Sequence, residues 1–340
     1  MARVCRPFRI RATCSLLVLC ASFAFTGHAA GTAFEASPYS VANLSPFGIL
    51  YGVPAIGGAN VLAPGAVNAE LAAAAANSFA FSNSGREDIY LDGETHRVAL
   101  RLRRGFAEGW EWTLELPWIS HSGGQLDGFI IRWHDLFGLP QGGRDQAERD
   151  QLRFSYRRDG IERVRLLEPV SGAGDMRIGL GKSLSRDARR PLALRAELKL
   201  PTGDPQRLTG SGAADLALWL SAASPVAGTQ TWSVYGGAGL AVLGRGDVLP
   251  ELQHRGVPFA SAGLGWRALP QLAVKVQIDA NRALYAQSNM PELGHTAMQL
   301  ALGGSLRIGA DSEFEFVVLE DVAVETVPDV TLRIALKIRF

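Results

Sequence analysis

The chain has 340 residues, of which 47% are hydrophobic and 20% are charged, and this composition excludes a disordered chain and a helical membrane protein. The formal net charge is +1, and nothing in its distribution indicates a nucleic-acid partner. The 38 glycines suit close-packed strands and tight turns.

Residues 1–29 are predicted to be a signal peptide. They begin with four arginines and no acidic residue, followed by an apolar stretch over residues 15–25 that is too short to span a bilayer. Small residues before position 30 predict cleavage after Ala29. All three cysteines lie upstream of it, so the mature chain would have neither a disulfide nor a thiolate metal site. A lipoprotein anchored at Cys20 is the alternative, although Leu19 is bulky for that signal.

Residues 30–67 are rich in Gly, Pro, Ala and Asn and are predicted to be an irregular N-terminal segment. We expect a simple leader to the first strand, and a position on the periplasmic side or inside the lumen is the alternative.

The last eleven residues alternate between apolar and polar side chains. Because side chains alternate across a strand, one face meets hydrocarbon while the other meets water. The apolar positions are Val330, Leu332, Ile334, Leu336, Ile338 and Phe340, and the cations opposite are Arg333, Lys337 and Arg339. This segment resembles the terminal strand of bacterial outer-membrane barrels. The resemblance implies that Leu336, Ile338 and Phe340 are recognised by the barrel-assembly machinery.

Similar alternation recurs along the chain. In residues 110–118, tryptophans occur at both ends of the apolar face, as at lipid interfaces. The other segments are 71–81, 97–103, 152–156, 176–180, 192–200, 214–220, 232–240, 260–266, 272–278, 298–308 and 314–318. These lengths suit tilted membrane-crossing strands. Residues 68–340 are therefore predicted to form an all-β, antiparallel, up-and-down transmembrane barrel of about 12 strands, with 10 or 14 as alternatives. A soluble periplasmic β-sandwich also alternates and is a further alternative.

Charges of both signs occupy the positions opposite the apolar ones, and we predict that they face the lumen. These residues are Arg97, Arg101, Arg103, Glu111, Glu115, Arg195, Glu197, Lys199, Lys275, Asp279, Glu313 and Glu315. They either pair and close the lumen or leave a narrow polar path, and their mixed sign argues against strong ion selectivity.

The rhythm breaks between residues 121 and 150, where a long polar stretch is expected to be an extracellular or inward-folded loop. It contains His121, Ser122, His134 and Asp135, residue types that can build an acyl-transfer site. Their spacing matches no nucleophile motif, so hydrogen bonds that shape the loop are the favoured interpretation. No metal-ligand spacing is present, and no cofactor is expected.

Four motifs carry a resemblance to a family. They are residues 115–145 (ELPWISHSGGQLDGFIIRWHDLFGLPQGGRD), 171–175 (SGAGD), 198–204 (LKLPTGD) and 208–212 (LTGSG). Together they resemble the bacterial family known as domain of unknown function 3187. The resemblance implies an outer-membrane β-barrel and supplies no catalytic residues.

The sequence thus predicts an outer-membrane barrel that is structural or a narrow transport channel for small or lipophilic solutes. Its expected partners are outer-membrane lipid, the assembly machinery and an unidentified small-molecule cargo. A lipid-modifying hydrolase with a His/Ser site in residues 121–135 is the alternative function.

Overall fold

The computed structural model describes residues 37–124, 128, 150–187, 189–226, 231–322 and 326–340. These residues belong to one compact unit that comprises residues 31–340. In these described ranges, fifteen strands pair in a single sheet, and two short helices, η2 (Pro205–Arg207) and α2 (Pro291–Gly294), lie in loops. Within the described ranges, no helix is long and apolar enough to cross a membrane.

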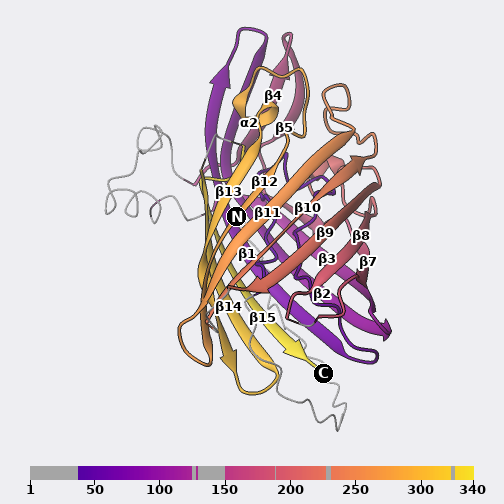
Figure 1. The fold of residues 1–340 in the computed structure, drawn as a ribbon. Coiled ribbons are helices and arrows are strands. Elements are labelled where there is room, and N and C mark those ends of the chain that lie inside the picture. The colour runs from indigo at the N-terminus through magenta and orange to yellow at the C-terminus, as the bar shows by residue number, and fades with distance from the viewer. Residues whose placement is uncertain (1–36, 125–127, 129–149, 188, 227–230, 323–325) are drawn as a thin grey trace, which may run out of the picture. The chain divides into compact units, whose positions relative to one another are not determined.

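Twelve of the strands form a closed antiparallel ring (Figure 1). In ring order they are β1 (Val67–Asn83), β2 (Glu87–Ala107), β3 (Trp110–Ser122), β7 (Arg177–Ser183), β8 (Leu192–Lys199), β9 (Asp215–Pro225), β10 (Trp232–Leu243), β11 (Gly256–Arg267), β12 (Leu272–Asn281), β13 (Ala297–Ile308), β14 (Ser312–Asp321) and β15 (Val330–Arg339). The ring closes where β1 pairs with β15, from Asn68 opposite Arg339 to Asn77 opposite Val330. The predicted 12-strand barrel is therefore confirmed.

The outer face of this wall is apolar. On β9, Leu216, Leu218 and Leu220 are 46–54% exposed, whereas Ala217 and Trp219, which alternate with them, are buried inside. Trp232 and Trp266 lie opposite each other on β10 and β11 and stack with ring centroids 5.7 Å apart. An apolar outer surface flanked by such aromatic rings is typical of a transmembrane barrel.

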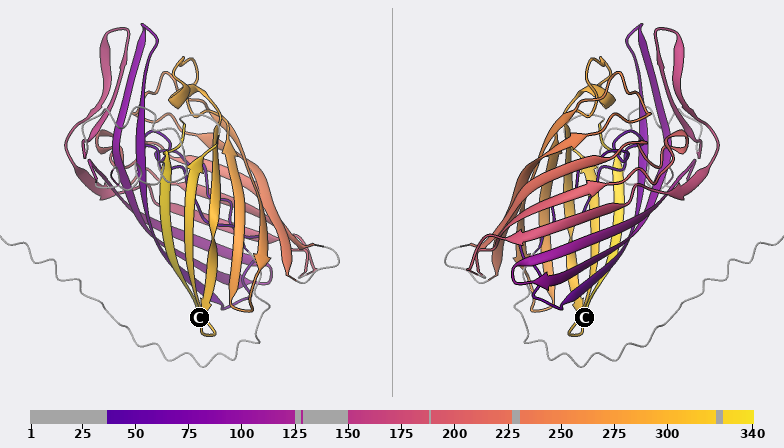
Figure 2. Two further views of the ribbon diagram at one scale, coloured as in Figure 1. Left: turned by 90° about the vertical axis from the view of Figure 1, so that its left-hand side faces the viewer. Right: turned by 90° about the vertical axis from the view of Figure 1, so that its right-hand side faces the viewer.

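The two ends of the barrel differ in the length of their connections. At the end where Phe340 lies, strands are joined by short turns such as residues 268–271 and 309–311 (Figure 2). At the other end, connections such as residues 244–255 and 282–296 are longer. In outer-membrane barrels, short turns face the periplasm and long loops face the exterior.

Three short strands do not belong to the wall: β4 (Arg153–Arg158), β5 (Ile161–Leu166) and β6 (Val170–Ala173). The expectation that residues 152–156 form a wall strand was wrong. β1 and β2 have 17 and 21 residues, more than the wall needs, and the start of β2 pairs with β4 beyond the ring (Figure 2). Phe154 and Tyr156 are buried in an apolar core rather than exposed to lipid.

Residues 37–66, hereafter the plug, run inside the ring before β1 begins. Tyr39 and Val41 pack against Ala301, Val317 and Leu319 of β13 and β14. The chain then turns near the long loops and returns past β8, β3 and β2 to a bridge between Pro64 and Gly105. The described part of the predicted N-terminal segment therefore lies in the lumen and is no simple leader.

Replacing Leu220 with lysine tests the lipid-facing assignment. A cation on the lipid face costs about 2–4 kcal/mol near the bilayer midplane, so Leu220→Lys should lower the free energy of unfolding by that amount. The measurement is urea titration of the protein refolded in lipid vesicles. The control is Gln271→Lys in an exposed short turn, for which we expect a change below about 0.5 kcal/mol. Equal effects of the two lysines would contradict the assignment.

Candidate functional site

The candidate functional site is the lumen, whose wall carries buried ion-pair networks. Glu115 on β3 lies between two register partners, Arg101 on β2 and Arg177 on β7. Its carboxylate accepts hydrogen bonds from Arg97 and from Arg101, whose Nε is 2.7 Å away, and Arg177 Nε lies 3.9 Å from it. One carboxylate thus holds three guanidinium groups together.

A second carboxylate, Glu111, lies nearer the short-turn end. It accepts from Arg103 Nη2 at 2.7 Å and from Arg195 Nη1 at 2.6 Å. Gly181 of β7 makes room for this pair, because a Cβ there would lie 3.0 Å from Glu111 Cγ and 3.1 Å from Arg195 Nη1. The glycine therefore lets the two side chains cross the inner face of β7.

The opposite wall has a matching network around Glu315 of β14. This carboxylate is fully buried and lies 3.0 Å from Lys275 Nζ, 2.6 Å from Arg333 Nη1 and 2.8 Å from Lys337 Nζ. Arg333 also donates to Glu70 of β1 at 2.6 Å. The network ties β12, β14, β15 and β1 together where the ring closes.

A third network closes the wall toward the long loops. Lys199 Nζ donates to Asp175 at 2.5 Å and to Ser211 Oγ at 2.6 Å, and it lies 3.2 Å from Asp215. Asp175 also accepts from the backbone amides of Gly203 and Ser211. The loop after β8 is thus fastened to the barrel rim.

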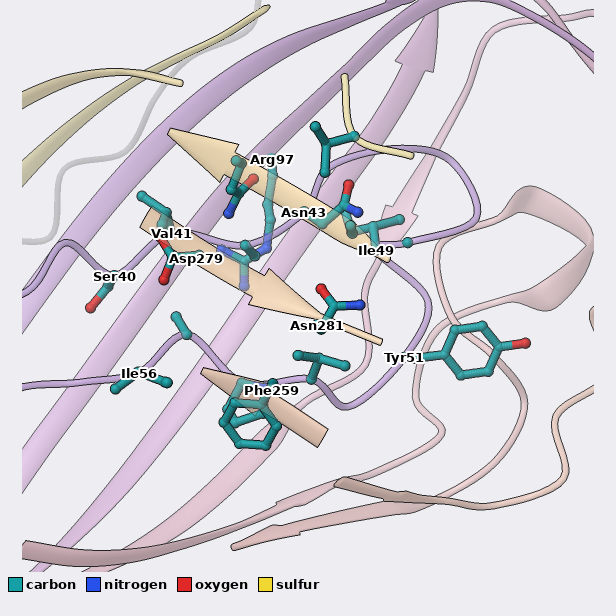
Figure 3. A pocket seen from close by; sticks show the side chains of 18 of the residues that line it. Ser40, Val41, Asn43, Ile49, Tyr51, Ile56, Arg97, Phe259, Asp279 and Asn281 are labelled. Carbon is teal, nitrogen blue, oxygen red and sulfur yellow. The ribbon is translucent and has the colours of Figure 1, made fainter. Parts of the chain in front are cut away.

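The plug occupies the space between these networks. Arg195 donates to the carbonyl oxygen of Gly58 at 2.7 Å, Arg177 to that of Tyr51 at 2.9 Å, and Lys275 to that of Ser37 at 2.8 Å. Between the plug and the wall lies a cavity of about 60 Å³, room for a few water molecules. Figure 3 shows Ser40 and Ile56 of the plug and Arg97 and Asp279 of the wall around it.

The long-loop end of the lumen is apolar. Phe47 and Tyr51 of the plug pack edge-on against Tyr285 of the loop after β12, with ring centroids 6.1 and 5.6 Å apart. Leu249 and Leu252 of the loop after β10 belong to the same buried core. In this structure, plug and loops together close the lumen.

The residues predicted to face the lumen lie on the inner face of the wall, where each of them makes an ion pair or a hydrogen bond. These contacts involve Arg97, Arg101, Arg103, Glu111, Glu115, Arg195, Glu197, Lys199, Lys275, Asp279, Glu313 and Glu315. Sequence reasoning missed Glu70 and Arg177. Arg177 stands between Met176 and Ile178, so alternation alone would have placed it on the inner face.

The two catalytic candidates that are described do not form an acyl-transfer pair. His121 Nε2 donates to the carbonyl oxygen of Leu208 at 3.0 Å, and Nδ1 lies 3.0 Å from Thr95 Oγ1. Both ring nitrogens are therefore occupied, and His121 is fully buried. Ser122, its neighbour on β3, points to the other face. His134 and Asp135 lie outside the described residues, as does most of the predicted loop, and their role stays a prediction.

Comparison with known proteins identifies the family. The family model described as "Protein of unknown function (DUF3187)" matches residues 12–340. The chain belongs to this family. A search of curated proteins found no match.

Among solved structures, the chain resembles the COG4313 outer membrane channel from Pseudomonas putida F1. The TM-score is 0.58 at 13% identity, and the match covers 82% of this chain and 97% of the other. The NanC porin matches with a TM-score of 0.45 at 7% identity, over 79% of this chain and 98% of that one. At such identities the likeness to the first structure concerns the fold, which is that of an outer-membrane barrel.

Replacing Glu315 with glutamine tests the inner networks. The change leaves three cations around a neutral amide, two of them buried (Lys275 and Arg333), and breaking a buried pair costs about 3–5 kcal/mol. Glu315→Gln should therefore lower the free energy of unfolding by that amount in vesicle-based urea titration. Glu251→Gln is the matched control, since Glu251 is 3.9 Å from Arg163 in an exposed pair worth about 0–1 kcal/mol. A loss for Glu315→Gln no larger than the control's would show that the network is not formed.

Proposed function

We propose that the protein is an outer-membrane channel for small solutes whose lumen is closed by its own plug. One observation carries the proposal: a polar inner wall is bridged by hydrogen bonds to a segment that is not part of the sheet. A barrel with a purely structural role would not need a separate segment such as the plug in its lumen. The plug is the element whose departure would turn this wall into a pore.

The polar contacts between the plug and the wall are contacts that water can replace. Three of its amides donate to wall side chains: Tyr39 to Gln277 at 2.8 Å, Gly52 to Asp215 at 2.8 Å and Leu62 to Glu111 at 2.9 Å. Each such bond contributes only about 0.5–1.5 kcal/mol net, because water offers a substitute. The wall, in contrast, is held by continuous ladders. Displacement of the plug therefore leaves the barrel intact.

A solved structure with a similar fold supports this proposal. The P. putida structure is an outer membrane channel, and it shares the barrel over most of both chains. In the present chain, the apolar layer at the long-loop end and the polar networks below it would be opened together when residues 47–56 move.

The proposed route to the membrane uses two segments, the signal peptide and the terminal strand. The signal peptide is removed after Ala29, and the assembly machinery recognises Leu336, Ile338 and Phe340. Leu336 on β15 and Phe340, the residue that follows β15, are 40% and 65% exposed, so they are accessible to such a receptor and then to outer-membrane lipid.

Deleting residues 38–62 tests the channel. We expect the intact protein to be nearly silent in planar-bilayer recordings and the deletion variant to show several-fold larger, stepwise conductance, because the lumen is emptied. A synthetic peptide of residues 38–62 should restore the block, and a scrambled peptide should not.

Heat-modifiable gel migration establishes that the deletion variant is folded. A folded variant that stays as silent as the intact protein would contradict the proposal.

A further inference from the structure

We infer that the open lumen carries small carboxylate anions along the basic face formed by β2, β3, β7 and β8. This deepens the proposed channel function and rests on it. In the closed structure, backbone carbonyl oxygens of the plug occupy the positions at which the oxygens of such anions would bind.

Two arginines of this face each bind two plug oxygens. Arg195 donates to Gly58 at 2.7 and 3.1 Å and to the carbonyl of Asn60 at 3.2 Å. Arg177 donates to the carbonyls of Tyr51 and Val53 at 2.9 and 3.4 Å. A planar guanidinium that faces two acceptor oxygens matches the geometry of a carboxylate. The plug thus presents these arginines with a neutral substitute for that group.

Further cations of the lumen are also turned toward the plug. Arg103 donates to the carbonyl of Asn60 at 2.8 Å, and Arg101 to Ser40 Oγ at 2.7 Å. Among the described contacts, fewer join wall carboxylates to the plug: Glu111 and Asp215 each accept one plug amide. Removing the plug therefore frees mainly charged N–H donors.

The side chains of this face also carry an excess of positive charge near the plug. Near the plug, five arginines of this face (Arg97, Arg101, Arg103, Arg177 and Arg195) share three glutamates (Glu111, Glu115 and Glu197). The glutamates are saturated by these pairs, so the excess charge is available to a solute. A lumen lined by these arginines and enclosed by low-dielectric walls focuses their electric field and raises the local concentration of counter-ions. A lipophilic solute would gain nothing from these groups.

The basic face should make the emptied lumen anion-selective. In a KCl gradient, the variant lacking residues 38–62 should show a reversal potential that favours chloride over potassium several-fold. Adding Arg177→Gln and Arg195→Gln should bring the ratio close to one. Arg163→Gln, on β5 outside the ring, should leave it unchanged. Acetate should reduce the chloride current of the first variant more than that of the arginine variant.

A second measurement uses the full-length chain. All cysteines precede the predicted cleavage site, so Ser40→Cys provides a single thiol beside Arg101. Its reaction with an anionic thiosulfonate should exceed that with a cationic one several-fold, relative to an exposed Gln271→Cys control. Arg101→Gln should reduce the ratio.

The two proposals fail in different ways. Conductance without chloride preference, or equal thiol reactivity with both reagents, would overturn the anion assignment and leave the channel. A folded deletion variant that does not conduct would overturn both.

Discussion

The structure depends on one constraint: in lipid, every backbone N–H and C=O must find its partner within the protein. An open sheet would expose two unpaired edges to hydrocarbon, so the first and last wall strands must meet. β1 and β15 do so over ten residue pairs, and Val67 and Phe340 exchange backbone hydrogen bonds at the end of the seam. The partition of side chains follows, because a closed ring gives each strand one face to lipid and one to the lumen.

Closure creates an interior that must be filled. The wall meets this need with carboxylates that each hold two or three cations, such as Glu115 and Glu315. Glycines let bulky groups cross the wall: the ring of Tyr235 lies where a Cβ of Gly263 would be. The plug supplies what the wall lacks, namely acceptors for arginines whose carboxylate partners are shared. The plug and the wall are therefore complementary in charge and in hydrogen bonding.

The sequence was most informative where the alternation of apolar and polar residues matches a wall with lipid on one side and the lumen on the other. Alternation assigned the faces of β3 and β15 because one side chain in two must be apolar in lipid. It misassigned Phe154 and Tyr156, because an apolar face looks the same whether it meets lipid or a buried core. Arg177 was missed although the same alternation places it beside Glu115. Alternation could not decide whether the plug lies in the lumen, since its polar contacts with the wall are made largely by backbone atoms, which every residue type shares.

Amide hydrogen exchange of the intact protein in lipid tests most directly whether the plug is an ordered but separable part of the barrel. Peptides covering residues 37–62 should exchange far more slowly than an unstructured chain and faster than the ladders of β13 and β14, because their amides are bound to side chains rather than to strands. Exchange of these peptides at the rate of an unstructured chain would show that the lumen is not filled by this segment and would contradict the account.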